Sequence, residues 1–160
     1  MSFGEWSADV DVEIAPLVFE LWRGGIETVS ACQDEGESLL ALAHSAPWLV
    51  EQSRVYAGRA YVDLLHTDDA CRFLDAVTNA GPRNALYRRM SSLATPDAWE
   101  VRLALYDTLS TQETGDWNSP SAFGVGVVRV RFPRGDVEEV VDRLQRWNSG
   151  GRGPFGAPED

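Results

Sequence analysis

The stretch RGGIETVSACQDEGE, residues 23–37, joins a helix to a strand. Its two glycines, Gly24 and Gly25, follow a helical apolar pattern, and glycine readily adopts the left-handed conformation that ends a helix. The residues Ile26–Cys32 then fit a strand, in which alternate side chains point to opposite faces. We therefore predict a helix that stops at the glycines and a strand that follows at once, with Ile26 and Cys32 on the same side.

The helix before the glycines begins in the segment DVEIAPLVFELW, residues 11–22. Its apolar residues recur at helical spacing. Proline is tolerated only in the first turn of a helix, so Pro16 places the start near Asp11 or shortly after it.

The rest of the chain alternates between helical and strand patterns. Helices are predicted at 37–46, 47–53, 68–81, 84–93 and 135–148. Strands are predicted at 58–67, 98–109 and 124–132. The last two strands alternate between apolar and polar residues, with Val101 and Leu103 on an apolar face and Arg129 and Arg131 on the exposed side.

These patterns predict an α+β domain of two layers, a four-stranded and mostly antiparallel sheet with helices packed on one face. A chain of 160 residues suits one such domain. We place it at 1–148, with an insert at about 36–58 and a long loop at about 108–124. The tail 149–160 is rich in glycine and proline, and we expect it to be flexible.

The composition excludes several kinds of chemistry. The formal net charge is −11, from 25 acidic and 14 basic residues, and every basic residue is arginine. The lack of lysine excludes Schiff-base chemistry and a P-loop lysine. The acidic charge makes direct nucleic-acid binding unfavourable, and it leaves mimicry of nucleic acid as an alternative. There is no signal peptide or long apolar run, so we expect a soluble, cytoplasmic protein that does not bind membranes.

Two segments carry a resemblance to known sequences. EIAPLVFELWRGGIETVSACQ (13–33) and AYVDLLHTDDACRFLDAV (60–77) resemble small uncharacterised proteins of GC-rich bacteria and their phages. In that group a helix runs into Gly-Ile-x-Thr and then Cys-Gln. The resemblance implies a phage- or defence-related setting and brings no established activity. The insert between Gly36 and Arg59 is not part of it.

The catalytic candidates are Cys32, His66 and His44. A cysteine nucleophile needs a base nearby, and these are the only two histidines. An antiparallel pairing of the first two strands would put Cys32 and His66 about 20 Å apart, whereas a parallel pairing would bring them together. A buried cysteine at a strand end is most often packing. Enzymatic function therefore stays an alternative.

The residues around Cys32, His44 and His66 raise two further possibilities, a metal site and a pterin site. Structural zinc needs ligands in short-spaced pairs, and the acids and thiol around Cys32 and His66 lack this spacing, so we predict no metal and no cofactor. The segments HSAPW (44–48) and VDLLHT (62–67) resemble the histidine motifs of pterin carbinolamine dehydratases. The resemblance would imply dehydration of a pterin, but the motif has one histidine in place of two and His66-Thr67 is reversed.

Exposed aromatic residues in polar loops are frequent anchors for protein partners. Trp117 lies in the long loop. Glu113 and Asp116 precede it and Asn118 follows it. Trp48 lies in the insert. The function that the sequence favours is therefore a small module that binds another protein, or itself as a homo-oligomer, through Trp117, Trp48, Glu113 and Asp116.

Overall fold

The structure is a computed structural model that describes residues 2–3, 6–7, 10–91, 95–106 and 125–150. Its centre is an antiparallel four-stranded sheet in the order β3-β4-β6-β5. The four strands are β3 (Thr28–Cys32), β4 (Arg59–Leu64), β5 (Glu100–Tyr106) and β6 (Val125–Pro133). Two short strands, β1 (Ser2–Phe3) and β2 (Trp6–Ser7), form a separate hairpin that the sequence patterns did not predict.

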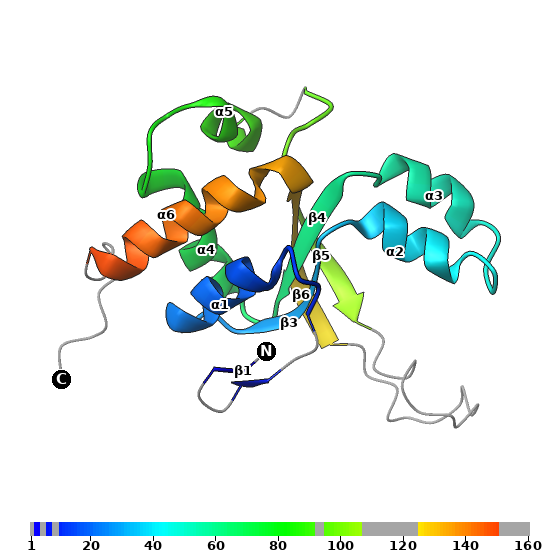
Figure 1. The fold of residues 1–160 in the computed structure, drawn as a ribbon, viewed down its shortest axis with the longest axis horizontal. Helices are drawn as coiled ribbons and strands as arrows, with labels where there is room; N and C mark the ends of the chain where they lie inside the picture. The colour runs from blue at the N-terminus through cyan, green and yellow to red at the C-terminus, as the bar shows by residue number, and fades with distance from the viewer. Residues whose placement is uncertain (1, 4–5, 8–9, 92–94, 107–124, 151–160) are drawn as a thin grey trace.

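Helices lie on both sides of this sheet (Figure 1). One face is covered by α1 (Ala15–Arg23), α4 (Thr67–Asn79) and α6 (Val137–Ser149), with the short α5 (Ala85–Ser91) beside them. On the other side, α2 (Glu35–Leu42) and α3 (Leu49–Val55) form a helical hairpin. A single turn of 3-10 helix, η2 (Arg134–Asp136), leads into α6. The predicted α+β class is confirmed, and the predicted insert is the α2–α3 hairpin.

The end of α1 follows from the glycines that open the quoted stretch. Gly25 has a φ of 69°. The amide of Gly25 donates to Trp22 O and the amide of Ile26 donates to Leu21 O, which is the hydrogen-bond pattern of a Schellman motif. Arg72 of α4 donates from its guanidinium to the carbonyl oxygens of the glycine turn. The turn is therefore held from both sides, and β3 starts at a fixed place.

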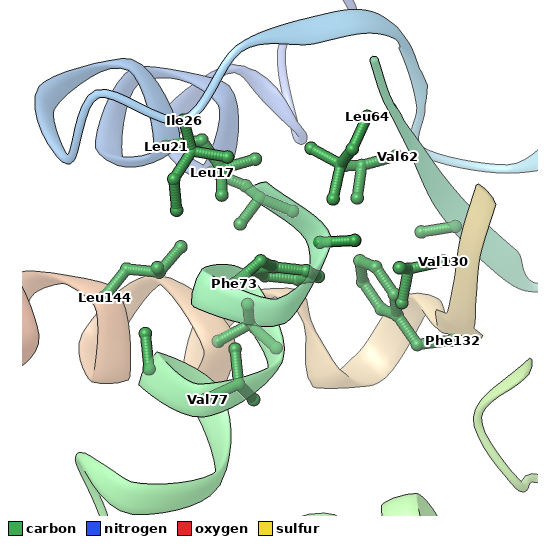
Figure 2. Close-up of a cluster of buried hydrophobic side chains, with 14 of the residues drawn as sticks. Leu17, Leu21, Ile26, Val62, Leu64, Phe73, Val77, Val130, Phe132 and Leu144 are labelled. Carbon is green, nitrogen blue, oxygen red and sulfur yellow. The ribbon is translucent and has the colours of Figure 1, made fainter. Parts of the chain in front are cut away.

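The core lies between the sheet and α1, α4 and α6 (Figure 2). Phe73 of α4, Trp99 before β5 and Phe132 of β6 form a row of stacked rings, with centroids 6.2 and 4.7 Å apart. Aliphatic side chains of β4 and β6, such as Val62 and Val130, are fully buried against this row. Because the row joins a helix to two strands, burial of these rings fixes how the layers meet.

Two sequence predictions about side-chain direction are wrong. Ile26 is in the core while Cys32 is opposite Tyr61 on the other face, because the β3–β4 register shifts between Thr28 and Ser30. A β-bulge of this kind reverses the alternation of the residues beyond it. The second error concerns β5, which is an edge strand that the helices do not cover. Its apolar residues Val101 and Leu103 are 52% and 85% exposed.

A buried arginine joins α6 to the turn after α4. The guanidinium of Arg143 is fully buried and donates to Val77 O at 2.7 Å and to Pro82 O at 2.6 Å. It also pairs with Glu139 at 2.8 Å. A Cβ at Gly81 would lie only 2.8 Å from this guanidinium, so any larger residue there would require the arginine side chain to shift. The arginine therefore supplies a donor to the buried carbonyl of Val77 at the end of α4.

Replacement of Arg143 by methionine should destabilise the fold by about 3 kcal/mol, because it removes the donor of the buried Val77 carbonyl and three further hydrogen bonds to Pro82, Asn84 and Glu139. The control is Arg146→Met on the same helix, where the side chain is 54% exposed. That change should cost less than about 0.5 kcal/mol. Urea unfolding followed by circular dichroism measures both. Equal losses for the two variants would contradict a structural role for the buried guanidinium.

Candidate functional site

The candidate site lies on the side of the sheet away from α1, α4 and α6. We call the sheet surface there the polar face; its members on the four strands are Ser30, Cys32, Tyr61, Asp63, Arg129, Arg131, Glu100 and Arg102. The sequence patterns placed Arg129 and Arg131 on an exposed side. That prediction is wrong, because Glu35 at the start of α2 reaches over the sheet to both arginines.

Arg129 is held by a carboxylate of the neighbouring strand. Its Nε and Nη2 atoms each donate to Asp63 at 2.8 Å, and Asp63 is fully buried. The guanidinium also lies over the ring of Tyr61, 4.1 Å from its centroid. Burial by itself would lower the pKa of Arg129, but the hydrogen bonds and charge of Asp63 raise it above its ordinary value. Arg129 is therefore a permanent cation with its charge already neutralised.

Arg131 is more deeply buried and bridges two carboxylates. Its Nε and Nη2 atoms donate to Glu35, and its Nη1 atom donates to Glu100 at 2.7 Å. The ring of Tyr56, just after α3, lies 4.0 Å from the guanidinium carbon. Burial by itself would lower the pKa of Arg131. The hydrogen bonds that Arg131 donates to Glu35 and Glu100, with the charge of Glu35, raise the pKa above its ordinary value. The pair Glu35–Arg131 thus links the α2–α3 hairpin to the middle of the sheet.

The root of the hairpin, which we define as Asp34–Gly36 with Tyr56–Gly58, is also tightly joined. Asp34 caps α2 by accepting from Glu37 N at 3.2 Å, and its second oxygen accepts from Gly58 N at 3.0 Å. A Cβ at Gly36 would lie 2.5 Å from Ser53 O, so the two helices touch through backbone. The root is fixed while the far end of the hairpin extends away from the sheet (Figure 1).

Cys32 lies at the edge of the polar face in a setting typical of packing. It is buried, and its Sγ atom lies 3.0 Å from Ser38 Oγ. Burial raises the pKa of the Cys32 thiol, and the hydrogen bonds from Ser38 and from the Asp34 backbone only partly oppose this. A raised pKa leaves less thiolate at neutral pH, which is unfavourable for a nucleophile.

The structure does not bring the histidines to Cys32. The β3–β4 pair is antiparallel, with Cys32 opposite Tyr61 and Thr28 opposite Leu64. His66 follows Leu64 at the other end of the pair, on the order of 15 Å from Cys32 by residue count. Its ring lies 3.9 Å from Glu27. His44 is exposed near the tip of the hairpin, with its Nδ1 atom 2.9 Å from Ala41 O.

The described residues offer little that would form a metal site or a catalytic pocket. They include no group of histidine, cysteine and acidic side chains that could hold a metal ion. Asp69, one of the acids close to His66, accepts from Glu27 N and pairs with Arg72. A surface depression of about 480 Å³ lies beside α5, and it contains neither Cys32 nor His66. Its Arg89 is already paired with Asp136 and Asp97.

The partner-binding candidates are divided by the structure. Trp117, Glu113 and Asp116 lie outside the described residues. Trp48 is the N-cap residue of α3 and is 64% exposed. Other apolar side chains of the hairpin are exposed with it; they are Leu40, Leu42, Val50 and Val55. In α2 the buried residues are Glu35 and Gly36, so none of its leucines is in the core.

Sequence reasoning missed the residues that build this site. Glu35 was considered only among the acids of a metal site near Cys32, and Asp63 was not singled out, although two arginines separated by one residue in β6 require carboxylates if they are to be buried. The alternation Arg129-x-Arg131 indicates a shared face, and that much was predicted. Nothing in the sequence indicates that Glu35, almost a hundred residues earlier in the chain, supplies the carboxylate.

No family model, no curated protein and no solved structure matches this chain. No helix in the described part of the chain is both long and apolar enough to span a bilayer.

The two thiols should differ in reactivity, because Cys32 is buried with a raised pKa and Cys71 is exposed. In single-cysteine variants made by Cys71→Ser and Cys32→Ser, iodoacetamide should modify Cys32 at least about tenfold more slowly than Cys71 at pH 8. Mass spectrometry over time measures both rates. In urea the rates should converge. Equal rates in the native protein would identify Cys32 as an accessible thiol and reopen the enzymatic alternative.

Loss of Glu35 should be costly, because it leaves Arg131 buried with one carboxylate instead of two. We expect Glu35→Ala to lower the free energy of unfolding by about 3 kcal/mol. The matched control, Glu37→Ala, removes a carboxylate from the same helix that is 70% exposed, and should change stability by less than about 0.5 kcal/mol. Denaturant titration distinguishes them. A neutral Glu35→Ala variant would show that the ion pair does not hold the hairpin.

Proposed function

We propose that this protein is a binding module whose α2–α3 hairpin, residues 35–55, docks onto another protein. The observation that carries the proposal is the placement of apolar surface. Half of the exposed large apolar side chains among the described residues belong to this hairpin. A soluble domain rarely leaves several such side chains exposed on one small element unless a partner covers them.

The hairpin holds its exposed apolar side chains on a fixed support. Its root is fixed by Asp34, Gly36 and the Glu35–Arg131 pair, and its buried side chains on α3 are Leu49 and Ser53. Trp48 is the N-cap residue of α3, at the end of the helix away from the root, and its side chain is exposed next to the buried Leu49. A rigid aromatic side chain on a fixed helix loses little conformational entropy on binding, which is the property of an interface hot spot.

The charge of the chain supports a basic partner. The formal net charge is −11, and the exposed carboxylates of Glu37 and Glu51 lie on the hairpin, 3.7 Å from Arg134 and 3.2 Å from Arg54 respectively. Acidic groups at the rim of an apolar patch favour association with a surface that carries arginine or lysine around its own apolar centre. We therefore expect a protein partner with a basic rim, and binding that weakens as salt concentration rises.

The test is Trp48→Ala. Because Trp48 is 64% exposed, its loss should change the free energy of unfolding by less than about 0.5 kcal/mol. Affinity for a partner isolated from the native host should fall at least about tenfold. Calorimetric titration with the purified partner measures the affinity, at low and at high salt.

Val12→Ala is the matched control, since Val12 is 87% exposed and lies outside the hairpin. It should leave both stability and affinity unchanged. A partner that binds the wild type, Trp48→Ala and Leu40→Ala variants equally would contradict docking through the hairpin. A stability loss of about 3 kcal/mol in Trp48→Ala would show instead that the tryptophan belongs to the core.

A further inference from the structure

The outer edge of β5 is an exposed apolar surface separate from the hairpin. β5 is last in the strand order, and within the described residues it pairs only with β6. Val101 and Leu103 share the sheet face of the core, opposite Val130 and Val128, yet they are 52% and 85% exposed. Helices cover Val130 and Val128 of β6 but leave Val101 and Leu103 of β5 exposed, so the apolar face of the sheet extends beyond the helices that pack on it.

The two edges of the sheet differ in how they resist pairing with another strand. β3 has five residues and a register shift between Thr28 and Ser30. A bulge and a short length are features that discourage edge-to-edge association. β5 has seven residues, EVRLALY, which contain no proline and pair with β6 without a shift. A regular edge strand with exposed apolar residues on one face can serve as a template for one more strand.

The charges of β5 point to a second copy of the same strand. Glu100 and Arg102 are on the polar face, and they lie 3.3 Å apart within the chain. Val101 lies between these two residues. If two copies of β5 pair antiparallel about a two-fold axis that passes between their Val101 residues, each Glu100 lies opposite the Arg102 of the other copy. The same axis places Val101 opposite itself, and opposite charges and β-branched residues in these positions are favourable cross-strand pairs.

We propose that β5 forms the interface of a symmetric homodimer, in which two copies of the chain pair their β5 edges antiparallel about Val101. Each Leu103 then lies across from Trp99 of the other copy, whose amide already donates to Arg89 O of α5, so the hydrogen bonds between the two strands end before Trp99. The pairing joins the two sheets into one. A single strand pair is a small interface, so we expect a dissociation constant in the micromolar range.

Sedimentation velocity of the full chain from about 1 to 100 μM tests the proposal. The wild type should show a monomer–dimer equilibrium, and Leu103→Lys should weaken it at least about tenfold, because lysine on an edge strand opposes pairing. The control is Val29→Lys on β3, where the side chain is 39% exposed. It should leave dimerisation unchanged, as should Trp48→Ala. A wild type that stays monomeric, or a dimer that Leu103→Lys does not weaken, would overturn the proposal.

A disulfide tests the axis of the dimer. In a Cys71→Ser background, Val101→Cys should form a covalent dimer on mild oxidation, because residues opposite each other at the axis have Cα atoms about 5.5 Å apart. Leu103→Cys should cross-link far more slowly. Melting temperatures confirm that each variant is folded. Faster cross-linking through position 103 than through 101 would overturn the pairing about Val101.

Discussion

The carboxylate of Glu35 receives hydrogen bonds from two arginines of β6, and through it the two sides of the molecule are joined. Arg131 could not be buried in the sheet without it, because an unpaired guanidinium is too costly to remove from water. The rings of Tyr56 and Tyr61 stack on the two guanidinium groups and exclude water from the pairs. The polar face is thus a second, charged core beneath the α2–α3 hairpin.

A charged core of this kind determines how the elements are positioned more than it increases the free energy of unfolding. Ion pairs lose in desolvation much of what they gain in attraction, whereas their directional bonds permit only one arrangement. Glu35 can meet both arginines only if α2 starts immediately after β3, and the close approach of Gly36 to Ser53 O then sets the position of α3. Leu40 and Trp48 are consequently held in water by the root of the hairpin, and their exposure follows from its position.

Much of the fold could be predicted from the sequence because local rules agree with it. The glycine turn after α1, the helical stripe of α4 and the alternation in β6 are all decided by neighbours in the chain. The errors arise where distant residues decide. The bulge at Thr28, the cover over Arg131 and the exposure of Leu103 depend on which element lies opposite. Within the candidate site, the sequence pattern could predict only that Trp48 is exposed and that Arg129 and Arg131 share one face of the sheet.

The exposed apolar residues of β5, Val101 and Leu103, are on the core face of the sheet, whereas the hairpin lies over the polar face. A dimer joined through Val101 would carry two hairpins at a fixed separation, each with its own Trp48. A partner with two copies of the docking surface would then bind the second hairpin intramolecularly, at an effective concentration that can reach the millimolar range. Weak contacts through a few exposed side chains would suffice for stable binding to a repetitive or oligomeric partner, and would not hold an isolated monomeric one.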